Sequence, residues 1–383
     1  MNVLVLGAGL MGRAIGFDLA VFSSFKKITI VDKDKTILEK AEKFLKNKKI
    51  DFDILDVTKL DDVKTFFQKY DVVISAIPYY FNYELSKFAI EEKTHFIDLG
   101  GNNSIVEKQR SLHDEAKKNK VLVLPDCGLA PGMTSVIARD IVDFLDIVDY
   151  IKIRVGGLPL DPVPPFNYQI VFSPNGLINE YVEDALVLDH GRVVAKKSMT
   201  EIETVEFPYP FGKMEAFLTS GGCSSMPYTF QNKVGYLDYK TIRYPGHCQM
   251  FKPLLDIGLA SEEPININRK QIKPRDVFIK LLWENLPVNG KDVVLMKVFS
   301  SGVKEGDKIG LEYSMIDYFD EENNITAMMR TTGYPVSIIA QMIEKGLIKE
   351  HGVFCCEEIV PCKSFFEELE KRSIHIHRRI SYS

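Results

Sequence analysis

"VLVLGAGLMGRAIGFDLA", residues 3–20, joins an apolar run to a glycine-rich turn and then to a helical pattern. Its three glycines, Gly7, Gly9 and Gly12, follow the spacing G-x-G-x-x-G. In that spacing the first glycine allows a tight turn, the second lets the backbone approach a pyrophosphate, and the third lets the helix pack on the strand. The free N–H groups at the start of the helix attract the same anion. The stretch predicts a dinucleotide-binding turn, with Leu10 and Met11 as further contact residues.

An acidic residue at the end of the next apolar run strengthens this prediction. Asp32 stands twenty residues after Gly12, where a carboxylate accepts hydrogen bonds from ribose hydroxyls and repels a 2′-phosphate. We therefore expect NAD rather than NADP as the cofactor. Two alternatives stay open, because Lys33 and Lys35 could neutralise a phosphate and the glycines could serve tight packing alone.

The first 125 residues alternate short apolar runs with longer helix-like segments. The runs cover residues 3–7, 28–32, 52–56, 71–77, 95–100 and 121–125. Strands that are apolar throughout are covered on both faces, as in a parallel sheet with crossover helices. Ligands of such sheets bind beyond the carboxyl ends of the strands, so the residues that follow the runs are candidate cofactor contacts. They are Asp56, Val57, Ala76, Ile77, Pro78, Leu99, Gly100 and Gly101, with Asp98 as a candidate catalytic group near the nicotinamide and Asp56 alternatively a helix-start residue.

The rhythm changes after about residue 130. Strand-like segments at 150–157, 185–197, 214–222, 293–302 and 309–319 follow one another without regular crossover helices. Residues 185–197 read as one hairpin, and 293–302 with 309–319 as another. We predict an α/β chain: a Rossmann-type doubly wound domain at 1–130, a second α+β domain on a mostly antiparallel sheet at 131–325, and C-terminal helices at 326–383 that return to the first domain. The open face of the second sheet predicts a homodimer.

Composition excludes several classes of protein. The chain of 383 residues is 45% hydrophobic and 26% charged, with a net charge of −5 and no long basic run, so a nucleic-acid partner is not expected. It has no apolar stretch long enough to span a membrane, and its first strand begins at Asn2, so we expect a cytoplasmic protein. The six cysteines lack paired CxxC spacing, and we expect reduced thiols and no metal site.

Five motifs carry a family resemblance. "GAGLMG" (7–12), "VVISAIP" (72–78), "FIDLGG" (96–101), "GLAPGMT" (128–134) and "RYPGH" (243–247) together resemble the saccharopine dehydrogenase superfamily. Within it, residues 155–181 are similar to lysine 6-dehydrogenases. The resemblance implies a homodimer that uses NAD to deaminate the ε-amino group of L-lysine oxidatively, giving ammonia and allysine, which cyclises to 1-piperideine-6-carboxylate. Saccharopine-forming reductases carry an Asp where this chain has Ala130, which disfavours the larger dicarboxylic substrate.

Such chemistry needs a base and anchors for an α-carboxylate and an α-ammonium. In "RYPGH" a strand-like segment ends and a helix-like one begins, and Arg243 can bind a carboxylate bidentately. His247 at the helix start is disfavoured as a cation, so it is the candidate base. Alternatively, Arg243 pairs with a structural carboxylate and His247 caps its helix.

Other candidates come from three further segments. Ser173 and Pro174 predict a helix start that places Asn175 and Glu180 on a short helix, with Glu180 as the ammonium partner or simply a solvated side chain. The remaining candidates are Pro131 and Gly132 as a wall of the substrate pocket or a plain linker turn, and Tyr168 and Asp126 without an assigned role. Two other functions stay open: a saccharopine- or carboxyspermidine-type reductase acting on another C–N bond, and a regulatory protein that binds a dinucleotide without turnover.

Overall fold

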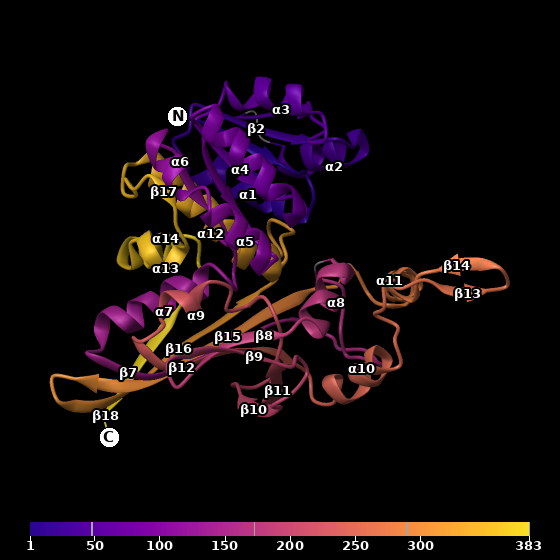
Figure 1. Ribbon diagram of the computed structural model, residues 1–383, viewed down its shortest axis with the longest axis vertical. Coiled ribbons are helices and arrows are strands. Elements are labelled where there is room, and N and C mark those ends of the chain that lie inside the picture. Colours follow the sequence, from indigo (N-terminus) through magenta and orange to yellow (C-terminus); the bar gives the residue numbers. More distant parts are fainter. Residues whose placement is uncertain (47–48, 172, 289, 383) are drawn as a thin grey trace. The chain divides into compact units, whose positions relative to one another are not determined.

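The chain divides into two compact units, each assembled from separate segments (Figure 1). The computed structural model describes residues 1–46, 49–171, 173–288 and 290–382. Unit 1 comprises Met1–Asp143, Ser224–Thr229 and Met329–His375. Unit 2 comprises Phe144–Cys223, Phe230–Met328 and Ile376–Ser383. Unit 1 therefore extends to Asp143 rather than to residue 130, and it takes a short segment from the middle of the chain.

Unit 1 is built on a parallel sheet, as predicted. Its described strands follow the order β17-β6-β5-β4-β1-β2-β3, and every neighbouring pair is parallel. The strands are β1 (Asn2–Leu6), β2 (Lys27–Asp32), β3 (Ile50–Ile54), β4 (Val72–Ser75), β5 (His95–Asp98), β6 (Leu122–Leu124) and β17 (Gly352–Val353). The chain order reverses between β1 and β4, which is where doubly wound sheets bind ligands.

Helices cover both faces of this sheet, which explains the uninterrupted apolar runs. One face packs in a cluster with α3 (Leu60–Phe67), α4 (Asn82–Glu91) and α6 (His113–Lys118). The other face carries α1 (Leu10–Phe22) and α2 (Lys35–Leu45), where a Cβ on Gly16 would lie 2.5 Å from Ile30. The connections are completed by η1 (Tyr79–Phe81), α5 (Asn103–Arg110) and α7 (Met133–Phe144).

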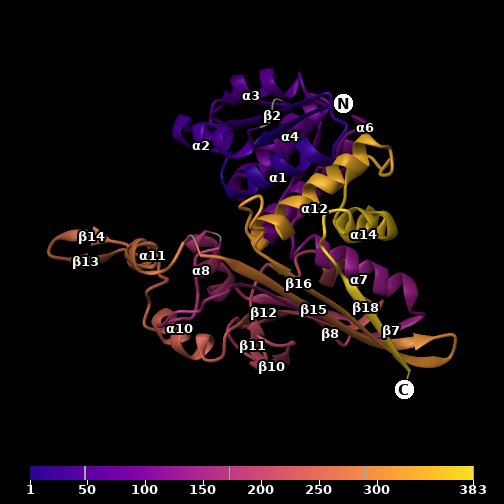
Figure 2. The same cartoon turned by 180° about the vertical axis from the view of Figure 1, so that it is seen from behind.

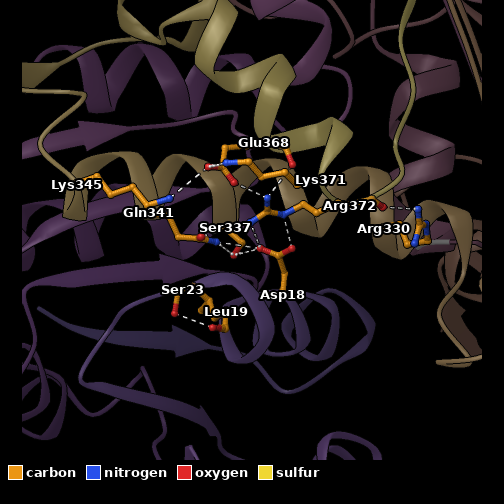
Figure 3. A network of polar contacts seen from close by, with 10 residues as sticks. All are labelled: Asp18, Leu19, Ser23, Arg330, Ser337, Gln341, Lys345, Glu368, Lys371 and Arg372. Atoms are coloured by element: carbon orange, nitrogen blue, oxygen red, sulfur yellow. Dashed lines mark hydrogen bonds and ion pairs between the residues drawn. The ribbon is translucent and has the colours of Figure 1, made fainter.

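The C-terminal helices are α12 (Ala327–Glu344), α13 (Cys356–Ile359) and α14 (Cys362–Glu370). They lie in unit 1, apart from the first two residues of α12, and α12 packs on α1. A Cβ on Gly333 would lie 2.8 Å from Ala14, so the two helix backbones lie close together. Figure 3 shows the Asp18–Arg372 network that joins them: Asp18 on α1 pairs with Arg372 at 2.5 Å and accepts from Ser337 at 2.6 Å.

Unit 2 contains a mixed, mostly antiparallel sheet, which confirms the predicted fold class. Its described strands follow the order β10-β11-β12-β7-β15-β16-β18, with β8 paired to β12 and β9 to β8. Only the β12–β7 pair is parallel among the described pairs of this sheet. The strands are β7 (Ile147–Pro159), β8 (Ala185–Asp189), β9 (Arg192–Lys196), β10 (Glu203–Glu206), β11 (Lys213–Leu218), β12 (Val234–Arg243), β15 (Asp292–Lys304), β16 (Asp307–Tyr318) and β18 (His377–Tyr382).

Helices cover one face of the second sheet and place the candidate site. The helices α8 (Pro174–Val182), α10 (His247–Asp256) and α11 (Pro274–Asn285) pack with Phe217 of β11 in one apolar cluster. On the opposite face, Val205 and Phe207 cover Ile242 and Leu295. A separate hairpin, β13 (Ile265–Ile267) with β14 (Lys270–Ile272), extends beyond α11 (Figures 1 and 2).

Three smaller predictions concern the chain as a whole. All six cysteines are free thiols. In the part of the chain that the structure describes, no group of three or more His, Cys, Asp and Glu side chains is arranged to hold a metal ion. None of the described helices combines the length and the apolar character that a membrane crossing requires.

Candidate functional site

The glycine turn of unit 1 has the geometry of a dinucleotide cradle. Gly7 adopts a φ of +98°, which favours glycine, and a Cβ on Gly12 would lie 1.8 Å from the Gly7 carbonyl oxygen. These two glycines are therefore required by the fold itself. A Cβ on Gly9 would meet nothing within 4 Å, so no contact inside the protein requires glycine there. Open space beside the first turn of α1 fits a pyrophosphate, and the residues fit the predicted cofactor.

Asp32 ends β2 next to the glycine turn. Its carboxylate accepts from the backbone N–H of Ala8 at 2.9 Å and from that of Asp34 at 3.0 Å. The glycine turn and the ribose-binding position are thus held together by one side chain. Asp34 caps α2 by accepting from Thr36 and Ile37, so it has a structural role that Asp32 does not share.

The remaining predicted cofactor residues all follow carboxyl ends of the parallel strands. Leu10 is exposed at the start of α1, and Ala76, Ile77, Leu99 and Gly100 are half-buried, while Pro78 and Gly101 are exposed. Asp56 accepts from the backbone and the hydroxyl of Thr58, at 3.1 and 2.8 Å, so it closes a local turn beside Val57. Met11 is half-buried beside Leu10.

The predicted catalytic residue Asp98 is fully buried and fully engaged. Its exposed fraction is 0%, and it accepts from Gly100 N and Gln109 Nε2, each at 2.7 Å. Burial raises the pKa of Asp98 to about 6. A carboxyl group so enclosed organises the turn after β5, and this geometry gives no support to direct contact with a substrate.

Asp126 lies next to Asp98 and belongs to a group of buried carboxyls. It accepts a hydrogen bond from Ser224 Oγ, and burial raises its pKa to about 7. Glu357 accepts from Ser225 at 2.6 Å and Thr229 at 3.0 Å, and burial raises its pKa as well. Sequence reasoning named Asp126 without a role and missed Glu357 and the two serines, because no spacing along the chain links them.

In unit 2, the strand-to-helix turn at "RYPGH" is as predicted. β12 ends at Arg243 and α10 begins at His247. Arg243 is 2% exposed, and its guanidinium lies 5.1 Å from the ring centre of Tyr168. It donates from Nε to Tyr181 Oη at 2.9 Å and from Nη1 to the carbonyl of Ile242 at 2.9 Å. Within the described residues no carboxylate forms an ion pair with Arg243.

His247 is enclosed by aromatic rings. Its exposed fraction is 0%, and its ring is stacked with those of Phe251 and Phe217, with ring centres 5.3 and 6.3 Å away. Nδ1 lies 2.9 Å from the carbonyl oxygen of Phe166, and Nε2 lies 3.0 Å from Tyr181 Oη. Burial, with the charge of Arg243, lowers its pKa to about 3. Because both ring nitrogens are engaged, the structure does not support the predicted role of His247 as a base that a substrate reaches.

Glu180 lies near Arg243 but does not bond to it. It is half-buried at the end of α8, and burial raises its pKa to about 7 against the opposing influence of Arg243. In the described chain neither residue has an oppositely charged partner at bonding distance. A guanidinium and a carboxylate that lie near each other without an ion pair are candidate anchors for a zwitterion.

The other predicted substrate residues are held elsewhere. Asn175 is exposed, and its Oδ1 accepts from Arg275 Nε at 2.9 Å, so it is tied to α11. Gly132 is buried, and a Cβ there would lie 2.2 Å from the Gly128 carbonyl oxygen at a φ of +124°. Pro131 is half-buried beside it in unit 1. These positions leave their predicted contact with substrate an open hypothesis.

Known proteins share this architecture. A saccharopine dehydrogenase (NADP+, L-glutamate-forming) of Pyricularia oryzae is 28% identical over 68% of this chain, and the chain spans 58% of that relative's length. A carboxyaminopropylagmatine dehydrogenase of Synechocystis is 21% identical over 94% of this chain and 93% of its own. The structure of saccharopine dehydrogenase (L-Glu forming) from Saccharomyces cerevisiae matches with a TM-score of 0.80 at 20% identity, covering 99% of both chains.

Two family descriptions match nearly the whole chain. Residues 3–124 match the saccharopine dehydrogenase NADP binding domain, and residues 128–374 match the saccharopine dehydrogenase C-terminal domain. The finer resemblance to lysine 6-dehydrogenases is not carried by these matches and stays a hypothesis. Because the two matches together cover most of the sequence, the chain belongs to the saccharopine dehydrogenase family.

Proposed function

We propose that the protein is an NAD(P)-dependent oxidoreductase that forms or cleaves a C–N bond in a secondary amine bearing an α-amino acid group. The observation that carries the proposal is the pair of unpaired anchors, Arg243 and Glu180. An α-carboxylate can accept from the guanidinium donors that remain free and an α-ammonium can donate to the carboxylate, so an amino acid end suits this pair, which forms no ion pair among the described residues. The relatives are named for reactions of this kind, which supports the same class here.

The chemistry in the oxidative direction is the removal of hydride from the carbon that bears nitrogen. When bound, a nicotinamide dinucleotide accepts that hydride. The resulting imine takes up water and splits into an aldehyde and a primary amine. Arg243 and Glu180 hold the amino acid end, and the buried rings of Tyr168 and Tyr181 keep water from the anchors. Exclusion of water strengthens both charge contacts.

We propose NAD as the preferred cofactor, on the strength of Asp32. Replacing this carboxylate by serine removes the repulsion of a 2′-phosphate, so Asp32→Ser should shift the kcat/KM ratio toward NADP by at least about tenfold. Asp34→Ser is the matched control, because serine keeps the helix cap and should leave the ratio unchanged. A wild-type protein that already prefers NADP would refute the cofactor assignment.

The test of the activity is a substrate panel with both cofactors. Saccharopine and L-lysine are offered with NAD+ and NADP+, and amine–aldehyde pairs are offered with NADH and NADPH, while the reduced nicotinamide is followed optically. Turnover of a secondary amine or of an amine–aldehyde pair supports the proposal. Cofactor binding by calorimetry without turnover of any amine would instead indicate a non-catalytic dinucleotide-binding protein.

Oxidative deamination of L-lysine is the second candidate. The same anchors fit its α-amino acid end, and Ala130 leaves no carboxylate at that position of the loop. Release of ammonia from lysine in step with cofactor reduction would favour this candidate over the first.

A further inference from the structure

We propose that His247 is a positioning residue that acts through Tyr181 to fix the direction in which Arg243 presents its guanidinium to a substrate carboxylate. The inference rests on the proposed function for the identity of the ligand. Its structural basis is a chain of three contacts, from Arg243 to Tyr181, from Tyr181 to His247, and from His247 to the carbonyl of Phe166.

The donor and acceptor of each contact follow from the groups involved. A guanidinium only donates, so Tyr181 Oη accepts from Arg243 Nε at 2.9 Å. A carbonyl only accepts, so His247 Nδ1 carries the proton that points to Phe166 at 2.9 Å. In a neutral imidazole Nε2 is then the acceptor, and Tyr181 donates to it at 3.0 Å. Each hydrogen bond of this series therefore has one donor and one acceptor, and the donors and acceptors cannot be exchanged.

The surroundings keep this direction fixed. His247 is stacked between Phe251 and Phe217, and Phe166 contacts its edge at 6.2 Å. Transfer of a proton from Tyr181 to His247 would place an imidazolium beside the Arg243 cation in a buried site. Burial raises the pKa of Tyr181 and lowers that of His247, and both directions oppose such a transfer. The chain therefore orients groups and does not move a proton.

The hydrogen-bond chain leaves some of the N–H donors of Arg243 available for a substrate. A guanidinium has five N–H groups, and two are used by Tyr181 Oη and the Ile242 carbonyl. No described residue supplies an acceptor for the other three. With Nε fixed by Tyr181 and one face against Tyr168, the free edge of the guanidinium keeps one orientation. A substrate carboxylate then meets donors that need no reorganisation.

Kinetics of three variants test the proposal. Tyr181→Phe removes the acceptor for Nε, and His247→Phe removes the acceptor for the Tyr181 hydroxyl while it keeps an aromatic ring in the cage. Each should raise the KM of the amino acid substrate about 10- to 100-fold, the weight of one charge-assisted hydrogen bond, with kcat changed less than about threefold. The double variant should be no worse than the stronger single, because both act on one chain.

Tyr244→Phe is the matched control. It also removes a phenol hydroxyl bonded to a backbone carbonyl, here that of Pro159 at 2.8 Å, one residue from Arg243. It should leave KM within about threefold of wild type. Loss of kcat with unchanged KM in His247→Phe, together with loss of one limb of the pH–rate profile, would overturn the proposal in favour of a proton-transfer role. Unchanged KM and kcat in both single variants would overturn it as well.

A second measurement does not depend on the substrate. Histidine labelled with ¹⁵N should show one ring, absent from His247→Phe, that stays in the neutral Nδ1–H tautomer from about pH 5 to 9. An imidazolium or an Nε2–H tautomer would refute the hydrogen-bond chain whatever the enzyme acts on. If the tautomer is as expected but no amino acid binds, the proposed function fails and the chain stands.

Discussion

Two buried arginines, one in each unit, differ in what surrounds their charge. Arg372 in unit 1 donates to Asp18 at 2.5 Å, to Glu368 at 2.7 Å and to Gln341 at 3.3 Å (Figure 3). Among the residues that the structure describes, Arg243 in unit 2 donates to a phenol and a backbone carbonyl alone. Arg372 is compensated by carboxylates at bonding distance, whereas Arg243 meets Glu180 only through a longer-range charge interaction. This difference underlies our proposal that Arg372 stabilises the fold and that Arg243 binds a substrate.

The largest expected effect is on the closed network. Arg372→Leu should lower the free energy of unfolding of the protein by about 3–5 kcal/mol at neutral pH, because it leaves Asp18 buried without its partner. Urea denaturation measures the change. The double variant Asp18→Leu/Arg372→Leu should lose less than the single variant, and an equal or larger loss would show that the charge pair is not the cause.

The open arginine should behave in the opposite way. Arg243→Met takes the nearby cation away from Glu180, but that carboxyl has a raised pKa and can take up a proton, so the free energy of unfolding should fall by less than the about 3–5 kcal/mol expected of Arg372→Leu. Its affinity for the amino acid substrate should fall at least about 100-fold, since the carboxylate loses its charged partner. Calorimetry with the active substrate and denaturation on the same preparation give both numbers. A stability loss as large as that of Arg372→Leu would erase the distinction between the two arginines.

A buried carboxyl of unit 1 extends the comparison to acidic groups. Asp126 is buried near Asp98 and Glu357, and it forms no ion pair within the described residues. Its folded pKa of about 7 exceeds the unfolded value near 4, so the folded state binds more protons and its contribution to stability falls as pH rises between these values. Asp126→Asn removes this penalty. Relative to wild type, the variant should gain on the order of 2 kcal/mol between pH 5 and pH 8 in urea denaturation. A difference that does not change with pH would contradict the assignment.

The smallest effect concerns the acidic half of the zwitterion anchor. Glu180→Gln should weaken binding of the amino acid about tenfold at pH 8, because a neutral amide replaces the carboxylate that contacts the substrate ammonium. In the wild type, affinity should rise as pH passes through about 7, because Glu180 must be ionised to hold an ammonium. The variant should lose that dependence. Glu183→Gln, on the residue that follows α8, is the control and should retain it.

Sequence reasoning succeeded where the physical cause is local. The glycine turn and Asp32 lie within 32 residues, and both are positioned by β1, α1 and β2 as predicted. The hairpin of β8 and β9 turns at His190 and Gly191, whose φ values of +49° and +71° suit a two-residue turn. Periodicity and turn-forming residues depend on neighbours in the sequence, so both can be predicted from one sequence.

Two strands escaped prediction because tertiary pairing alone defines them. β17 has two residues, too few for any period to appear. β18 reads HRRISY and is exposed along its whole length, without the alternation that marks a half-buried strand. It is recognisable only through its pairing with β16.

The candidate site was predicted only in part, because tertiary contacts also define it. Arg243 and Glu180 were named from residue chemistry, and the structure brings them near each other. Tyr181 was missed, although it contacts both Arg243 and His247, because it lies 62 and 66 residues before them in the chain. Only folded coordinates could show that both ring nitrogens of His247 are engaged.

The late strands and helices have a consequence for how this chain can be made and cut. β17 completes the first sheet and β18 the second, while residues 224–229 are built into unit 1 from the middle of the sequence. A fragment ending at residue 143 would lack α12 and Arg372, so Asp18 would lose both its ion pair and the helix that covers it. Synthesis from the N-terminus therefore cannot complete either unit before residues 352–382 are reached, because both sheets take a strand from that segment.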